Sequence, residues 1–136
     1  MPGWAARALE DLPLAADAEP GASWYPLQHL FGFTAFGANA FVALEPGHVL
    51  VEQHDEQSSG QEELYLVLRG SAEFTLDGAS VTGAAVFVVA VRDPGVTRRA
   101  VALEAGTTLL VLGGEPTDTF ESTWLASHFE GVQRLL

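Results

Sequence analysis

The chain has 136 residues, a length typical of one domain. Apolar residues make up 48% of it and charged residues 18%, a balance that excludes intrinsic disorder and supports a packed core. Six arginines stand against 18 acidic residues, which gives a formal net charge of −12. This excess of acid excludes a surface for duplex nucleic acid, and an anionic membrane would repel the chain.

The residue types that the sequence lacks narrow further the kinds of protein it can encode. Without cysteine there are no disulfides, thiolate metal sites or cysteine nucleophiles. Acidic Glu10 and Asp11 interrupt the first residues, which therefore do not read as a secretory signal, and the cytoplasm is the expected compartment. Lysine and isoleucine are absent while alanine, valine and glycine abound, a composition that suggests a GC-rich bacterial genome.

In chain order, residues 4–12 predict one or two helical turns, ended by Pro13. From residue 30 onward, short apolar runs alternate with glycine, proline and Asp-Gly punctuation, which is a strand pattern. Asp77-Gly78 and Pro94-Gly95 predict tight turns. Expected strands lie near 31–36, 40–45, 48–54, 63–69, 71–76, 85–91, 98–103 and 107–112.

The last residues change period. Leu125, Phe129, Val132 and Leu136 recur three or four apart, which predicts a short C-terminal helix over about 123–136. Eight short strands at this spacing are typical of an all-β sandwich or barrel. We therefore expect a single domain over residues 1–136, with its core barrel over about 30–114 and short helical segments at both ends.

Residues 47–70 carry the strongest chemical signal. Side chains two apart on a strand face the same way, so His54 and Glu56 are expected to point together and Asp55 away. Glu63 and Tyr65 share a face of the next strand. A barrel open at one end can thus gather an imidazole and two carboxylates, a mixed nitrogen and oxygen set for a cation such as Mn²⁺.

This segment resembles the first motif of the cupin family, which has a metal-binding glutamate seven residues before a glycine, as Glu63 precedes Gly70. The turn at Pro94-Gly95, followed by Arg98, resembles the second motif. The resemblance spans about residues 40–112. It implies a double-stranded β-helix, a small jelly-roll barrel that is often found as a homodimer.

Two positions depart from the family pattern. The family has histidine where this chain has Glu56, and histidine again where it has Arg98. The loop from His54 to Glu63 is also about two residues longer than usual. Arginine has no lone pair for a metal, repels a divalent ion and attracts a carboxylate. An ion pair of Arg98 with Glu63 or Glu56 in place of the metal is the simplest expectation.

Three functions remain open. The first is a metal-free pocket for a small molecule, in which Arg98 clamps an anion such as a carboxylate. The second is an enzyme of dioxygenase or isomerase type with Mn, Fe, Ni or Zn on His54, Glu56 and Glu63. The third is a structural or accessory homodimer whose pocket is a relic closed by Arg98 and Glu63. The expected pocket residues are His54, Glu56, Glu63, Tyr65, Phe87 and Arg98.

The sequence gives less support to other kinds of enzyme chemistry. No Gly-x-Ser-x-Gly elbow or glycine-rich phosphate loop occurs. A proton-transferring pair of His54 with Glu56 stays open, as in an epimerase of similar fold. Trp4, Trp24 and Trp124 fall outside the expected strands, and such aromatics favour a barrel end or a dimer contact.

Overall fold

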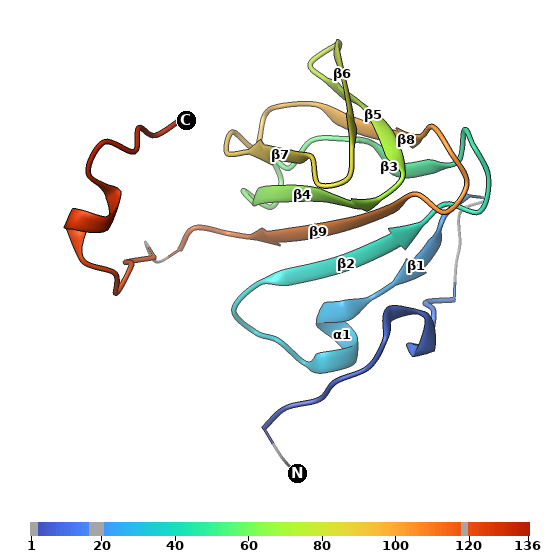
Figure 1. Ribbon diagram of the computed structural model, residues 1–136, viewed down its shortest axis with the longest axis horizontal. Helices are drawn as coiled ribbons and strands as arrows, with labels where there is room; N and C mark the ends of the chain where they lie inside the picture. Colours follow the sequence, from blue (N-terminus) through green and yellow to red (C-terminus); the bar gives the residue numbers. More distant parts are fainter. Residues whose placement is uncertain (1–2, 17–20, 118–119) are drawn as a thin grey trace.

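The computed structural model describes residues 3–16, 21–117 and 120–136. Within them, nine strands form two antiparallel sheets that pack face to face, as expected for an all-β jelly-roll (Figure 1). The strands are β1 (Ser23–Tyr25), β2 (Gly37–Val42), β3 (Val49–His54), β4 (Glu62–Arg69), β5 (Ser71–Leu76), β6 (Ala79–Ala84), β7 (Val88–Val91), β8 (Arg98–Ala102) and β9 (Thr108–Gly114).

One sheet has the order β1-β2-β9-β4-β7 and the other β3-β8-β5-β6. Alternation along each strand turns one set of side chains into the space between the sheets. In β4, for example, Tyr65 and Val67 are buried while Leu64 and Leu68 are exposed. The core is built mainly of Leu50, Val51, Tyr65, Val67, Phe74, Val89, Val91, Leu109 and Val111, with alanines between them.

Tight turns join neighbouring strands. Asp77 and Gly78 both have positive φ, 49° and 85°, as the expected two-residue hairpin between β5 and β6 requires. Gly70, with φ of 76°, turns the chain from β4 into β5, and a Cβ there would lie 2.8 Å from the Cα of Thr107. Gly70 is thus required both by its backbone conformation and by its close neighbour.

The expected strand over 31–36 is wrong. Residues Leu27–Phe31 form the short helix α1, which Gly32 ends in a left-handed conformation. Phe33 and Phe36 follow in a loop, with their rings 4.9 Å apart and exposed. The first strand instead lies earlier, at β1, so that the sheet begins before residue 30. Its three residues are too few to show a period.

The segment after the Asp77-Gly78 turn also differs from expectation. Residues Ala79–Ala84 form β6, although serine, threonine and glycine gave them no apolar period. Pairing with the whole length of β5 supplies the strand. The strand expected over 85–91 is correspondingly shorter and covers Val88–Val91 as β7.

The ends of the chain hold less helix than expected. The N-terminal helical segment is a single 3-10 turn, η1 (Leu9–Asp11). The helix expected over 123–136 is reduced to the 3-10 turn η2 (Ala126–Phe129), and its apolar side chains stay exposed. Apolar periodicity alone does not stabilise a helix that has no surface to pack against. In the described part of the chain, none of the helices has the length and hydropathy that a membrane crossing needs.

Candidate functional site

A cavity of about 620 Å³ opens between the two sheets. Strands β1, β2, β3, β4 and β9 line it, together with Leu14 and Ala15 of the N-terminal segment. Four of the six expected pocket residues lie on its wall: His54, Glu56, Glu63 and Tyr65. Phe87 and Arg98 are not among the lining residues.

His54 is the last residue of β3, and Glu56 lies beyond the end of the strand. Their meeting therefore depends on the loop rather than on strand alternation. The backbone N–H of Glu56 donates to the carbonyl of Pro94, and the N–H groups of Ser59 and Gly60 donate back to the carbonyl of Glu56. This turn brings the Glu56 carboxylate to the His54 ring, while Asp55 is exposed.

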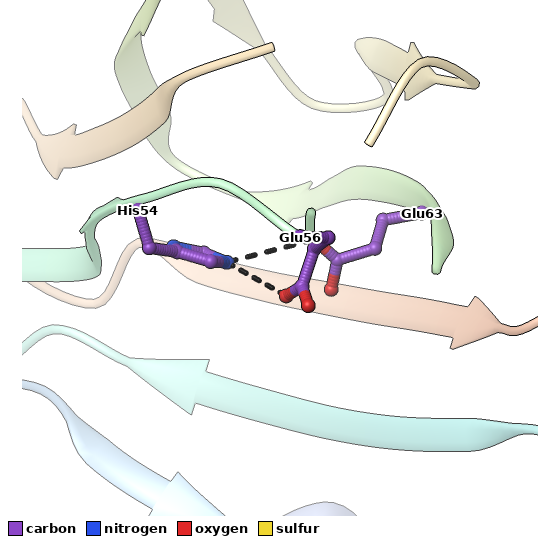
Figure 2. A group of neighbouring side chains, drawn as sticks. All are labelled: His54, Glu56 and Glu63. Atoms are coloured by element: carbon purple, nitrogen blue, oxygen red, sulfur yellow. Dashed lines mark hydrogen bonds and ion pairs between the residues drawn. The ribbon is translucent and has the colours of Figure 1, made fainter. Parts of the chain in front are cut away.

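Both nitrogens of the His54 ring have partners. Nδ1 lies 2.8 Å from the carbonyl oxygen of Glu52, which can only accept, so Nδ1 carries a hydrogen. Nε2 lies 3.0 Å from Oε1 of Glu56 and 3.7 Å from Oε1 of Glu63. Figure 2 shows the three side chains converging, with both carboxylates on the Nε2 side of the ring. Ser59 donates to the other oxygen of Glu56.

Arg98 and Tyr65 both donate hydrogen bonds to the carboxylate of Glu63. Nη1 of Arg98 donates to Oε1 of Glu63 over 2.8 Å, and the Tyr65 hydroxyl donates to the same oxygen over 2.6 Å. Glu63 comes from β4 and Arg98 from the start of β8, so this ion pair joins the two sheets. The structure thus places Arg98 opposite an acid, and that acid is Glu63.

The Arg98 side chain is enclosed, with an exposed fraction of 1%. Its Nε and Nη2 donate to the carbonyl of Val96, and Nη2 also lies 3.4 Å from the carbonyls of Asp93 and Pro94. The guanidinium therefore holds the turn at 93–96 as well as Glu63. An anion clamp for a ligand in the cavity does not fit this placement.

Tyr65 is buried beneath the same carboxylate. Desolvation by burial, followed by the hydrogen bond to Glu63 and the negative charge of Glu63, raises the pKa of Tyr65 well above its ordinary value of 10.0, against a smaller opposite effect of Arg98. Tyr65 is consequently a neutral hydroxyl donor throughout the physiological range. Its ring packs on Phe74, with centroids 6.0 Å apart.

Phe87 lies elsewhere in the core. Its ring centroid is 6.4 Å from that of Phe74, and it packs over Gly83 of β6. A Cβ on Gly83 would overlap this ring, so glycine there makes room for Phe87. Phe87 thus fills the barrel rather than lining its opening.

One wall of the cavity, built from aromatic and amide side chains, was not predicted from the sequence. Trp24 of β1 stacks on Phe41 of β2 with centroids 6.5 Å apart, and its indole N–H donates to Oδ1 of Asn39 over 2.8 Å. All three residues line the cavity. A tryptophan outside the expected strands was a hint of a barrel end, but Asn39 and Phe41 carried no signal, since their place depends on the pairing of β1 with β2.

Donor atoms of His54, Glu56 and Glu63 all lie within 4.8 Å of one another. One nitrogen and two carboxylate oxygens form a set that suits first-row divalent ions. The same Oε1 of Glu63 that faces His54 also accepts both hydrogen bonds from Arg98 and Tyr65. The group is therefore a candidate metal set with a fixed positive charge beside it.

Two facing antiparallel sheets with a cavity between them match the cupin fold of solved structures. A cupin-superfamily sugar phosphate isomerase from Silicibacter pomeroyi superposes with a TM-score of 0.63 at 18% identity, covering 79% of this chain and 74% of its own. An RmlC-like cupin from Shewanella frigidimarina gives a TM-score of 0.61 at 18% identity, covering 82% and 91%.

A Streptomyces nucleoside dehydratase gives a TM-score of 0.58 at 14% identity, with 82% of each chain covered. No protein-family model matches the sequence, and no curated protein is similar to it in sequence. The chain thus has the cupin fold, and some proteins of this fold are enzymes. At these identities the likeness defines the fold and leaves the activity to the site.

Proposed function

We propose that this cupin-fold protein binds a small organic molecule in the cavity between its sheets, without a resident metal. The observation that carries the proposal is the ion pair of Arg98 with Glu63, whose nitrogen and oxygen lie 2.8 Å apart. Arg98 stands where the cupin motif has a metal-binding histidine. Its guanidinium supplies the positive charge that a metal ion supplies to such a glutamate.

The residues present do not fit a metal ion well. A cation bound between His54, Glu56 and Glu63 would share Oε1 of Glu63 with a buried guanidinium. Two positive groups at a few ångströms in a poorly hydrated place repel one another strongly. Arginine does not deprotonate to relieve this repulsion. A divalent-metal enzyme would thus need Arg98 to release Glu63 first.

The cavity wall favours an uncharged ligand over the carboxylate that a free Arg98 would have attracted. Its ionisable side chains are three glutamates and His54, whereas its Trp24–Phe41 pair offers a flat apolar surface. Asn39 and Gln61 add amide groups. This mixture suits a hydroxyl-bearing ring compound, such as a sugar or a nucleoside, which is bound by stacking and hydrogen bonds. A nucleoside dehydratase with this fold lends the nucleoside part of the proposal further support.

A thermal-shift and calorimetric screen tests this proposal. The panel contains nucleosides, free sugars, sugar phosphates and small carboxylates at equal concentration and without added metal. We expect binding among the uncharged compounds and its loss in Gln61→Trp, which narrows the cavity. Gln57→Trp changes an exposed glutamine of the same loop outside the cavity and keeps binding. Binding that persists in Gln61→Trp, or no binding of any compound in the panel, would instead favour an accessory protein whose pocket is a relic.

A second candidate is a metal-free enzyme that moves a proton through His54 and Glu56. It is favoured by the 3.0 Å contact between Nε2 and Oε1 on the cavity wall. Its test uses a ligand found in the screen, incubated in D₂O and followed by NMR. Exchange of a carbon-bound hydrogen that disappears in Glu56→Gln while binding persists would support the enzyme. Binding without exchange would leave the protein as a binding module.

A further inference from the structure

One amide on the cavity wall is fixed in its orientation by a neighbour. Asn39 of β2 lines the cavity, and the indole N–H of Trp24 lies 2.8 Å from its Oδ1. An indole N–H can only donate, so the end of the Asn39 amide that faces Trp24 has to be the oxygen. The hydrogen bond that the described residues give this side chain uses Oδ1, which leaves the two hydrogens of Nδ2 for a molecule in the cavity.

The amide lies beside a flat aromatic surface. Register places Trp24 of β1 opposite Phe41 of β2, and Asn39 is two residues before Phe41, on the same face of the strand. The two rings are nearly parallel, with 19° between their planes, and Trp24 is 40% exposed. A planar ring that stacks on this pair therefore has one edge next to the Asn39 amide.

The acidic side of the cavity lies two strands away from Asn39. Strands β2, β9 and β4 are neighbours in one sheet (Figure 1), and register joins Asn39 to Val111 and Val111 to Tyr65. Two interstrand spacings put the backbones of Asn39 and Tyr65 about 10 Å apart. The Tyr65 hydroxyl donates to Glu63, and Glu56 lines the same side. Ionised carboxylates can only accept, so the cavity has a donor on its aromatic side and acceptors on its acidic side.

We propose that the NH₂ group of Asn39 selects the ligand of this cavity, and that the ligand is a nucleoside whose base bears a carbonyl group. This inference rests on the proposed function and narrows it. The base stacks on Trp24 and Phe41, its carbonyl accepts a hydrogen bond from Nδ2 of Asn39, and the sugar hydroxyls donate to the carboxylates. A free sugar has no planar ring for the aromatic side. The cavity of about 620 Å³ has the volume of a small-molecule site.

Trp24 has a second part in this scheme, as a positioning residue. Its N–H holds the oxygen of the Asn39 amide away from the ligand. Without that N–H the amide is free to turn over and present its oxygen, which repels a carbonyl. Selection by Asn39 therefore depends on the indole N–H as well as on the amide itself.

Isothermal titration calorimetry with two probes tests the proposal. The probes are uridine and its analogue with a phenyl ring in place of uracil, which keeps the ribose and a flat ring but has no carbonyl. Wild type should bind uridine about tenfold more tightly than the analogue. Asn39→Asp keeps an oxygen for the indole N–H and replaces the NH₂ group by a second oxygen. It should lower the affinity for uridine at least about tenfold and leave the affinity for the analogue nearly unchanged.

Two further variants separate selection from charge and from folding. Gln57→Glu makes the same amide-to-acid change at an exposed position outside the cavity lining and should alter neither affinity. Trp24→Phe keeps an aromatic ring and removes the N–H, so the ratio of uridine to analogue affinity should fall several-fold while the analogue still binds. Circular dichroism of each variant verifies that the barrel is folded.

The outcomes distinguish this inference from the proposed function. Equal affinities of wild type for the two probes, or a ratio that Asn39→Asp preserves, would overturn the role of Asn39 and leave small-molecule binding in place. A free sugar that binds where uridine does not would likewise overturn the nucleoside. No binding of uridine, the analogue or free sugars would overturn the proposed function together with this inference.

Discussion

Arg98 and Glu63 carry opposite charges in a place that water hardly reaches. Side-chain exposure is 1% for the arginine and 10% for the glutamate. Such a pair is costly to assemble, and removal of one partner leaves the other charge buried and unpaired. The effect of the pair on stability is therefore seen mainly when one partner is removed and the other charge stays buried without it.

We accordingly expect Glu63→Gln to lower the free energy of unfolding by about 3 kcal/mol, measured by urea denaturation at neutral pH. Glu62→Gln is the matched control. It lies one residue earlier on the same strand, and its ion pair with Arg92 is exposed, so its effect should stay within about 0.5 kcal/mol. Equal effects of the two substitutions would contradict a buried ion pair at Glu63.

Tyr65 gives a pH-dependent prediction. Its pKa is raised by burial and by Glu63, so the folded chain keeps the phenol proton at a pH where the unfolded chain has released it. The unfolded state then binds fewer protons than the folded state, and stability falls as the pH rises above about 10. Below that pH the two states bind this proton equally and the effect vanishes.

Spectrophotometric titration of Tyr25→Phe measures this directly, because Tyr65 is then the sole tyrosine of the chain. We expect no phenolate absorbance at about pH 11 while circular dichroism still shows the folded barrel. Absorbance that rises with a midpoint near 10 in the folded protein would show that the Tyr65 hydroxyl is neither buried nor held by Glu63.

At the scale of elements, the turns that end the strands fix where the site residues fall. Gly70 closes β4 directly after the segment that carries Glu63 and Tyr65. Both Gly70 and Gly78 have positive φ, but a Cβ on Gly70 would meet Thr107, whereas one on Gly78 would meet nothing within 4 Å. The two glycines thus share a backbone conformation and differ in their surroundings.

Alanine at the two positions separates these contributions. Gly78→Ala should cost about 1 kcal/mol through backbone strain alone. Gly70→Ala should cost at least about 2 kcal/mol more, because β4 and the 104–107 turn must move apart. Urea denaturation of both variants supplies the comparison. Similar losses would mean that the approach of Gly70 to Thr107 is loose in solution.

Motif spacing predicted the polar part of the site, and long-range pairing decided the rest. Spacing from Glu63 to Gly70 and the turn before Arg98 are local features, so they can be read from the chain. His54 and Glu56 were expected together through strand alternation, yet a loop brings them together after β3 has ended. Trp24 and Asn39 reach the cavity through the pairing of β1 with β2, which no local pattern encodes.

At the scale of the whole molecule, the all-β jelly-roll was predictable because alternation and turn residues agree along most of the chain. The C-terminal segment over 123–136 was not, since a helical period predicts a helix only where an apolar surface supports it. The strand expected at 31–36 does not form for a related reason. An apolar run of that length is compatible with a strand or with a helical turn that a glycine ends, and here the chain forms the helical turn. These two errors fall in segments that lie outside the central strands of both sheets.

We infer that the Arg98 guanidinium, rather than a metal ion, neutralises Glu63. Elemental analysis tests this inference on untagged protein purified without chelator from medium supplemented with Mn, Fe, Co, Ni and Zn. We expect no stoichiometric metal in wild type, and about one ion per chain in Arg98→His, which restores an imidazole facing His54 and Glu63. Arg99→His, on the opposite face of the same strand, should bind none. Near-stoichiometric metal in wild type that is lost in Glu63→Ala would contradict the claim.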